Sequence, residues 1–218
     1  TPGDLGTWDV GAVGTPTVIR DGDTLKMWYA ASTTNPPSQI QIGYATSTDG
    51  IVWTKYVNNP FLELGSPGEW DDYWVTLPTV VKDGSTYKMW YTGSRFSVGT
   101  ECIGYATSPD GINWTKYDDP LTLNAPYAES DPVLEVTPGS WDAFLVFQPC
   151  VIKISIAFEM WYAGSNGSLQ RIGYAVSTDG IEWNKLPDPV LMETSALLAP
   201  SVIYHNDVYE MWYTGSNR

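Results

Sequence analysis

The chain has 218 residues, including 11 Trp and 14 Tyr, and carries a formal net charge of −14 at pH 7. Because nucleic acid and anionic lipid would both repel so acidic a chain, we expect neither to be bound by charge. No apolar run approaches the ~20 residues that a membrane-spanning helix needs, and the length is ample for a sizeable core.

The predicted elements begin with a strand that follows Trp-Asp at 8–9 and carries Pro-Thr-Val-Ile at 16–19. A polar turn separates it from a second strand with Lys-Met-Trp-Tyr at 26–29. The third strand opens with Ile-Gly-Tyr-Ala at 42–45, whose alternation indicates two different faces. Ser-Thr-Asp-Gly at 47–50 then forms a tight turn, because glycine readily adopts positive φ, and a fourth strand begins at a tryptophan.

The same order of motifs returns along the chain. The segment at 42–53 recurs at 103–114 and at 172–183, and Met-Trp-Tyr also occurs a fourth time at 211–213. Four antiparallel strands per unit, at spacings of about 50 to 70 residues, are typical of a β-propeller blade. We therefore predict one all-β propeller domain at 1–218, with about three and a half blades. The predicted blade repeats are 6–64, 65–123, 124–191 and the partial repeat 192–218.

We expect function on the blade face opposite the Asp-Gly turns, because only the loops of that face vary between units. These loops lie at 35–39, 95–101, 124–139 and 166–171. The three Trp-Asp pairs are expected to enter the innermost strands there, near the central channel. Indole faces can stack on sugars and carboxylates can accept hydroxyl hydrogen bonds, although an Asp repeated in every unit also suits the capping of a strand entry. The predicted carbohydrate-binding residues are Trp8, Trp70, Trp141, Asp71, Arg95, Glu101 and Arg171.

The fourth unit holds only two predicted strands, and three and a half units cannot close a five-bladed ring. Either the chain is truncated, or a smaller ring closes with help from the N-terminus, or chains associate to cover the open faces. The turn Ile-Ser-Ile-Ala at 154–157 is apolar where other units have polar turns, which indicates either a contact surface or an irregular turn. The predicted partners are carbohydrate and a second copy of the chain, bound through the open blade edge and the Ile154/Ile156 turn.

Residue types that form metal or redox sites are few. Cys102 and Cys150 are expected in different radial layers, which favours two thiols over a disulfide. His205 falls in a hairpin on the uniform face, where no catalytic or metal role is expected for it. We predict no cofactor and no metal site, but the acidity is compatible with a structural calcium ion and with an extracellular location.

Three elements carry a resemblance to a known superfamily. They are Met-Trp-Tyr-x-Gly-Ser, Ile-Gly-Tyr-Ala-x-Ser-x-Asp-Gly-Ile-x-Trp, and Trp-Asp followed by Pro-x-Val-Ile. Over nearly its whole length the chain resembles the five-bladed propeller superfamily of arabinanases, β-xylosidases, invertases and levansucrases, in glycoside hydrolase families 43, 32 and their relatives. The resemblance implies a propeller fold and activity on carbohydrate.

The same resemblance implies three carboxylates on the first strands of successive blades, at or just before the residue that precedes the strand proline. Two are needed because one protonates the leaving oxygen while the other activates water or attacks. Here the preceding residues are Thr15, Leu77, Gln148 and Ala199, and Gly14, Thr76, Phe147 and Leu198 stand one step earlier. The catalytic set is therefore absent from its expected places. The only substitutes are Asp9, Asp71 and Asp142, seven residues upstream of each proline.

The Ser-x-Asp-Gly-x-x-Trp turn also resembles the Asp-box of sialidases. A sialidase holds the carboxylate of its substrate with three arginines, and Arg20, Arg95, Arg171 and Arg218 show no sign of converging, so we reject that activity. The sequence favours a non-catalytic carbohydrate-binding or scaffold module. The alternatives are an active glycoside hydrolase on plant or microbial polysaccharide, and an assembly module that completes its ring by oligomerisation.

Overall fold

Fifteen strands make up the regular structure of this chain in a computed structural model, which describes residues 1–4, 7–34, 39–95 and 99–215. Within these ranges no helix is long and apolar enough to cross a membrane. The first unit comprises β1 (Ala12–Asp21), β2 (Thr24–Ser32), β3 (Gln41–Ser47) and β4 (Thr54–Lys55). The second comprises β5 (Trp74–Asp83), β6 (Thr86–Ser94), β7 (Glu101–Ser108), β8 (Thr115–Lys116) and β9 (Pro132–Leu134). The third comprises β10 (Leu145–Ile154), β11 (Ala157–Ser165), β12 (Gln170–Ser177) and β13 (Asn184–Lys185), and the fourth comprises β14 (Leu197–His205) and β15 (Val208–Gly215).

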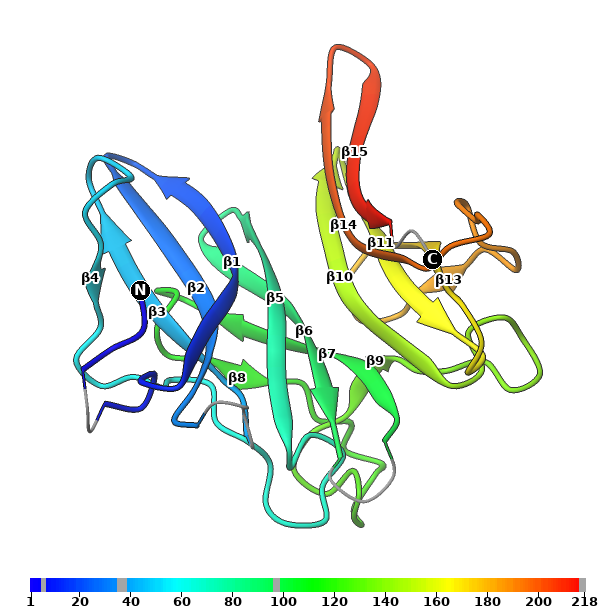
Figure 1. Cartoon of the computed structure of the whole chain (residues 1–218), viewed down its shortest axis with the longest axis horizontal. Coiled ribbons are helices and arrows are strands. Elements are labelled where there is room, and N and C mark those ends of the chain that lie inside the picture. Colours follow the sequence, from blue (N-terminus) through cyan, green and yellow to red (C-terminus); the bar gives the residue numbers. More distant parts are fainter. Residues whose placement is uncertain (5–6, 35–38, 96–98, 216–218) are drawn as a thin grey trace.

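Each of the first three units is an antiparallel sheet whose strands pair in sequence order. A single parallel bridge between Glu101 and Leu145 joins the second and third units into one nine-stranded sheet. The first strands β1, β5, β10 and β14 pack on one another in succession, so the units are arranged side by side (Figure 1). The prediction of an all-β fold built from repeated antiparallel units is confirmed.

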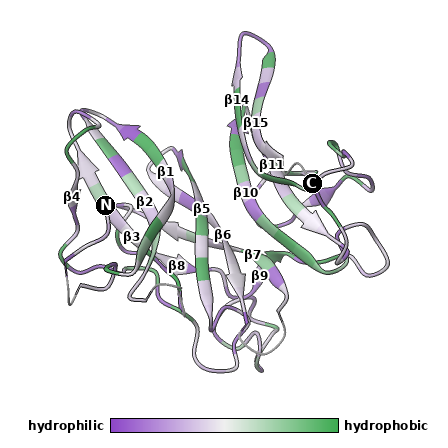
Figure 2. Cartoon of the chain, viewed as in Figure 1, coloured by the Kyte–Doolittle hydropathy of each residue, from purple (hydrophilic) through white to green (hydrophobic). Residues whose placement is uncertain are grey.

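The core lies between neighbouring units, because both faces of each second strand are apolar. In β6 the side chains of Met89 and Tyr91 pack toward the first unit and Trp90 packs toward the third, and all three are fully buried. Hydrophobic residues also recur along β5 and β10, the first strands of the second and third units, which lie in the middle of the array (Figure 2). Burial of large aromatic rings between sheets is the main stabilising contribution here.

The Asp-Gly turns are held by their own backbone, as their residue types indicate. The carboxylate of Asp49 accepts hydrogen bonds from the N–H groups of Ile51 and Val52 at 2.8 and 2.9 Å, and Gly50 has a φ of +77°. The other two turns repeat this geometry. At Asp110 burial raises the pKa, but hydrogen bonds from the backbone N–H groups of Asn113 and Ile112 outweigh it and lower the value to about 2.

The second unit ends differently from the first and the third. Leu123 is exposed, and the chain continues through a loop to β9, where buried Leu134 pairs with Ile103. In the first and third units, Leu62 and Leu191 pair with the third strand at the equivalent position. In the second unit an inserted loop places the equivalent leucine later in the sequence. The spacing of the local motifs therefore did not locate this residue.

Candidate functional site

An axial cavity of about 260 Å³ lies where the four first strands meet. It is lined by the three residues around the proline of each first strand, at 15–17, 77–79, 148–150 and 199–201. At each of these points the register between the first and second strands shifts, which marks a β-bulge. Bulges of this kind re-aim side chains and are over-represented next to functional sites.

The residue before each proline adopts a left-handed backbone conformation. The φ angles are +45° at Thr15, +53° at Leu77, +54° at Gln148 and +50° at Ala199. None of these is a glycine, and a side chain in this region costs on the order of 1–3 kcal/mol per residue. Such strain persists only where the surroundings fix it, so the bulges and the packing of the four first strands hold these residues around the axis.

Hydrogen bonds between neighbouring units hold these bulges in place. The N–H of Ala199 donates to the side-chain oxygen of Gln148 at 2.7 Å, and the N–H of Gln148 donates to the hydroxyl of Thr92 at 3.0 Å. The cavity therefore presents hydroxyl and amide groups beside proline rings. Its one ionisable side chain is Cys150, and burial raises the pKa of that thiol. These groups can hydrogen-bond a neutral polar ligand but carry no acid–base pair for neutral pH.

The Trp-Asp pairs lie elsewhere, immediately before β5 in the second unit and before β1 and β10 in the others. Asp71 has no exposed surface, accepts a hydrogen bond from the Tyr91 hydroxyl at 3.2 Å and lies 2.6 Å from the Lys116 ammonium. The ring of Trp70 stacks on Tyr91 with 5.8 Å between centroids. The polar contacts recur as Asp9 with Tyr29 and Lys55, and as Asp142 with Tyr162 and Lys185. Trp141 stacks on Tyr162 in the same way, whereas Trp8 meets Tyr29 at an interplanar angle of 40°.

The pairs do precede the first strands, as expected, but they do not lie beside the central channel. Each Trp ring instead crosses the second and third strands of its own unit, over glycines, because a Cβ on Gly93 would lie 2.2 Å from the Trp70 ring. Asp9, Asp71 and Asp142 are enclosed in three separate units, and none of them is among the residues that line the axial cavity. At Asp9 burial raises the pKa, but the Lys55 ammonium and the Thr7 hydroxyl more than offset this, and the carboxyl stays below its usual range.

The other predicted binding residues lie at the loop end of the second and third units. Glu101 begins β7, and burial raises the pKa of its carboxyl to about 7. Arg95 follows β6 and lines a pocket of about 170 Å³ together with Trp70 and Tyr127. The Nε atoms of Arg95 and Arg171 are buried without a hydrogen-bond partner in the described part of the chain.

Sequence reasoning missed Trp74 at this end of the second unit. Its ring stacks on Tyr73 with 5.2 Å between centroids, and its buried Nε1 has no hydrogen-bond partner among the described residues. The signal was an aromatic pair at one strand entry that the other units lack. Two loops that the sequence assigned to this face fall partly outside the described residues, at 35–38 and 96–98.

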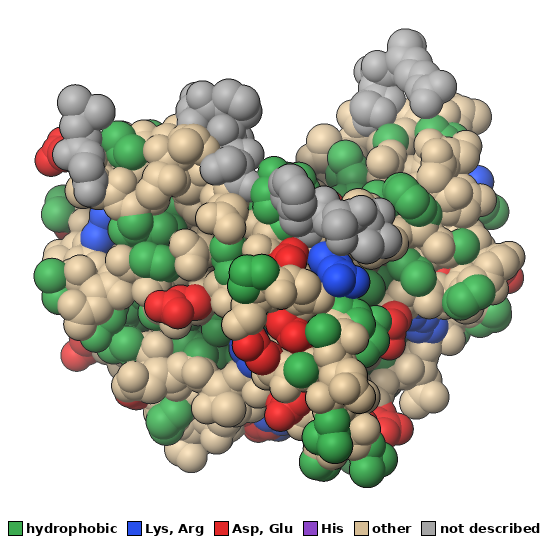
Figure 3. Space-filling view, turned by 90° about the horizontal axis from the view of Figure 1, so that it is seen from below, with side chains coloured by type: hydrophobic (Ala, Val, Ile, Leu, Met, Phe, Trp, Pro, Cys, Tyr) green, Lys and Arg blue, Asp and Glu red, His purple; other side chains and the backbone are tan. Residues whose placement is uncertain are grey.

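Figure 3 shows the face of the molecule seen from below, where acidic side chains are more abundant than basic ones. Acidic side chains gather near its middle beside a basic group, while hydrophobic side chains lie scattered across it. Over the described ranges, no group of three or more His, Cys, Asp or Glu residues is placed to hold a metal ion. Cys102 and Cys150 are free thiols, and His205 is half-exposed, 3.7 Å from the Glu210 carboxylate.

Comparison with known sequences gives distant relatives. No family model matches the chain. Two uncharacterized proteins of Mycobacterium tuberculosis are each 29% identical over 229 residues, which covers 98% of this chain and 70% of each relative. A β-1,2-mannobiose phosphorylase of Thermoanaerobacter is 28% identical over 126 residues, which covers 52% of this chain and 37% of that protein.

Comparison with solved structures establishes the fold. A glycoside hydrolase superimposes with a TM-score of 0.71 at 18% identity, over 94% of this chain and 66% of its own length. A family 117 glycoside hydrolase of the marine bacterium Zobellia galactanivorans gives 0.71 at 16% identity, over 98% and 69%. A thermostable family-43 glycoside hydrolase gives 0.67 at 20% identity, over 95% and 66%. The chain thus spans about two thirds of the length of the structures that it matches and shares their propeller fold.

Proposed function

Because the chain has the β-propeller fold of glycoside hydrolases, we propose that it binds carbohydrate at the axial cavity without cleaving glycosidic bonds. The observation that carries this proposal is the lining of that cavity. The four strained positions around the axis hold Thr15, Leu77, Gln148 and Ala199, whereas hydrolysis needs a pair of carboxyl groups. The fold positions a ligand, and the side chains present can hold it but not exchange protons with it.

The chemistry of the lining suits a neutral sugar. Hydroxyl groups of Thr17 and Ser201 and the amide of Gln148 can exchange hydrogen bonds with sugar hydroxyls, while the proline rings and Leu77 offer apolar surface to sugar C–H groups. The cavity of about 260 Å³ is smaller than the roughly 300–1,000 Å³ of sites for drug-sized ligands. We therefore expect it to take the end of an oligosaccharide, about one ring deep.

The test is glycan-array binding followed by calorimetry and an assay for released reducing sugar. Ser201→Tyr, which fills the cavity from an exposed position, is expected to weaken binding at least about tenfold. Thr54→Tyr, on exposed β4, is the matched control and leaves binding unchanged. No binding to any glycan, or equal binding by both variants, would contradict the proposal.

One observation favours cleavage as a second candidate. With its pKa raised to about 7, Glu101 is partly protonated at neutral pH and can act as a general acid. If inorganic phosphate is the nucleophile, as the phosphorylase relative suggests, one carboxylic acid suffices, and the unpartnered Nε atoms of Arg95 and Arg171 are candidate phosphate donors. Release of a sugar phosphate that is lost in Glu101→Gln and kept in Glu63→Gln would establish this function.

An extracellular location belongs to the same proposal. It is supported by the net charge of −14, which suits a soluble surface exposed to polymeric substrates. Fractionation of a culture that makes the protein should place it in the medium, and retention in the cytosol would contradict this.

A further inference from the structure

Gln148 is the one amide side chain among the four strained positions around the axial cavity. Its backbone has a φ of +54°, and its N–H donates to the Thr92 hydroxyl of the second unit at 3.0 Å. Its side chain contacts the fourth unit, where Oε1 accepts a hydrogen bond from the N–H of Ala199 at 2.7 Å. Both bonds cross junctions inside the array, so Gln148 is fixed from two sides.

The bond to Ala199 settles which end of the Gln148 amide is free for a ligand. A backbone N–H can bond only to the oxygen of a carboxamide, so Oε1 faces the fourth unit and Nε2 is turned away from Ala199. Nε2 makes no hydrogen bond within the described ranges, and it is not one of the buried atoms there. Because Gln148 lines the cavity, its amide offers a ligand two N–H donors.

The rest of the lining is apolar or carries hydroxyl groups. A proline ring from each first strand and the side chain of Leu77 lie around the cavity, together with the hydroxyls of Thr17 and Ser201. The one ionisable group of the lining is the Cys150 thiol, and because burial raises its pKa the lining carries no charge near neutral pH. An ionised carboxylate would leave water for this lining without a counter-ion, which is costly in a chain of net charge −14. The lining therefore disfavours an acidic sugar.

An acetamido group combines the features that such a lining can recognise. Its carbonyl oxygen is an acceptor without a proton, which suits the Nε2 donors of Gln148. Its methyl group is apolar and can lie against the proline rings, and its own N–H can donate to the hydroxyl of Thr17 or Ser201. A sugar hydroxyl can accept from Nε2 as well, but it brings no methyl group to cover the apolar part of the cavity.

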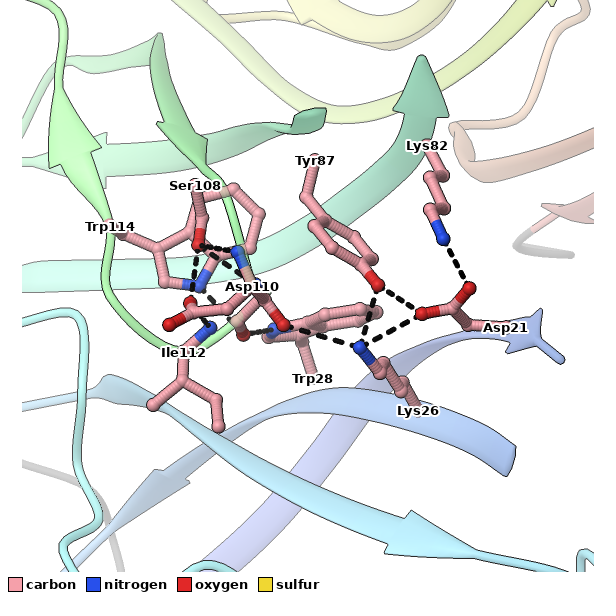
Figure 4. A network of polar contacts seen from close by, with 10 residues as sticks. Asp21, Lys26, Trp28, Lys82, Tyr87, Ser108, Asp110, Ile112 and Trp114 are labelled. Carbon is pink, nitrogen blue, oxygen red and sulfur yellow. Dashed lines mark hydrogen bonds and ion pairs between the residues drawn. The ribbon is translucent and has the colours of Figure 1, made fainter. Parts of the chain in front are cut away.

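The junctions between units keep this cavity in shape. Between the first and second units, Trp28 Nε1 donates to the carbonyl oxygen of Gly111 at 2.9 Å, and Asp21 forms an ion pair with Lys82 (Figure 4). An equivalent indole-to-carbonyl bond joins the second and third units at 2.8 Å. The spacing of the first strands is therefore set before a ligand arrives, and a preformed site loses little binding free energy to ordering.

We propose, on the basis of the carbohydrate binding proposed above, that the axial cavity takes the acetamido group of an N-acetylated hexosamine. Gln148 is the specificity-determining residue: its Nε2 donates to the acetyl carbonyl oxygen while its Oε1 stays bonded to the N–H of Ala199. The acetyl methyl packs against the proline rings of the lining. A hexose without the acetamido group leaves these apolar contacts unmade and the amide donors without their carbonyl, so it binds more weakly.

Calorimetric titration of the wild-type chain with matched monosaccharides tests the class of sugar. N-acetylglucosamine is expected to bind at least about tenfold more tightly than glucose, and N-acetylgalactosamine than galactose. Equal binding within each pair, or array binding confined to glycans without acetamido groups, would overturn this inference and leave carbohydrate binding at the cavity in place. Binding of no glycan at all would overturn both.

Gln148→Glu tests the part played by the amide. The carboxylate keeps an oxygen for the N–H of Ala199 but replaces the free donors with a second acceptor, so binding of N-acetylglucosamine at pH 7 should fall at least about tenfold. Near pH ~4 the carboxyl takes up a proton, its O–H can donate to the carbonyl oxygen, and part of the affinity should return. The control Gln39→Glu makes the same change at an exposed position away from the cavity and should bind as the wild-type chain does at both pH values.

Gln148→Met separates the hydrogen bond from a purely structural effect. Methionine keeps the length of the side chain but offers no N–H and no charge, so binding should be weak at both pH values. Circular dichroism and the melting temperature show whether each variant folds. Undiminished binding by Gln148→Glu at pH 7, or a loss in Gln148→Glu that matches Gln148→Met at both pH values, would overturn the assigned role of the amide.

Discussion

Asp71 and Lys116 form a buried ion pair, with 2.6 Å between Oδ2 and Nζ, beneath the Trp70 ring of the second unit. The Tyr91 hydroxyl donates to the same carboxylate oxygen. The equivalent carboxylates in the first and third units make the same two contacts. A repeated, enclosed pair of this kind holds the outermost strand of each unit to the segment that precedes its first strand.

Removing the carboxylate should therefore destabilise the fold. In Asp71→Asn the Lys116 ammonium stays largely buried without a counter-ion, and we expect the free energy of unfolding to fall by about 3 kcal/mol. Urea unfolding followed by tryptophan fluorescence measures it. The control is Asp118→Asn, at an exposed position shortly after Lys116 in the chain. It should change the free energy of unfolding by less than about 0.5 kcal/mol. An equal effect of both substitutions would argue against a structural role for the pair.

The glycines under the Trp rings should not tolerate a methyl group. A Cβ on Gly93 would lie 2.2 Å from Trp70 and 2.9 Å from the side chain of Asp71, so Gly93→Ala must displace the ring. We expect a loss of about 2–3 kcal/mol in unfolding free energy. Gly14→Ala is the control, because nothing lies within 4 Å of the added atom. A melting temperature that falls equally in both variants would contradict a clash with the Trp70 ring, because restricting the unfolded chain at a glycine by itself raises stability.

Stability should depend on pH through Glu101. Its pKa is raised by burial to about 7 in the folded chain, so the folded state binds the proton more tightly than the unfolded state does. This contribution is fully present below the ordinary glutamate pKa and is lost as the pH rises through about 7. Between about pH 4.5 and 7 the wild-type chain should lose about 2 kcal/mol relative to Glu101→Gln. Unfolding curves across this range, with exposed Glu63→Gln as control, measure the difference; parallel pH profiles for wild type and Glu101→Gln would contradict it.

The strain around the axis should be relieved by glycine. Ala199 is exposed and has a φ of +50°, so Ala199→Gly removes a steric cost without removing a buried contact. We expect the unfolding free energy to rise by about 0.5–1 kcal/mol, although Ala→Gly in an ordinary strand lowers it. Ala128→Gly, outside the left-handed region, should show the ordinary sign. Thermal unfolding of the two variants measures both changes in stability. A lower melting temperature for Ala199→Gly than for the wild-type chain would contradict the prediction.

Repetition made the unit predictable. Trp90 and its counterparts keep the same spacing from the strand proline in every unit. Trp28 and Trp90 each donate a hydrogen bond to a glycine carbonyl in the Asp-Gly turn of the next unit, and an insertion before either Trp would break that contact. The strand order within a unit, the turns and the all-β class followed from this spacing. The inserted loop before Leu134 carries no such constraint, so its length could not be foreseen.

The candidate site was harder to predict, because it depends on packing between units. The place of Trp70 depends on Gly93 and Gly104, two glycines on strands that follow it in the chain. Their recurrence at fixed positions was the available signal. Thr15 and Leu77 have no local preference for positive φ, so their strained conformation follows from the neighbouring first strands and could not be inferred from residue type.

The junction between the third and fourth units is built differently from the other two. Ile154 stands at the position where Asp21 and Asp83 form ion pairs with a lysine of the next unit. Instead, Glu159 accepts a hydrogen bond from the Tyr209 hydroxyl at 2.9 Å, and the thiol of Cys150 accepts one from the N–H of Val202 at 3.2 Å. The β14–β15 hairpin is therefore coupled to the array without the lysine–aspartate bond that ties the earlier sheets together. In native-state hydrogen exchange its amide protons should be released first, by a local opening that leaves the three preceding sheets folded.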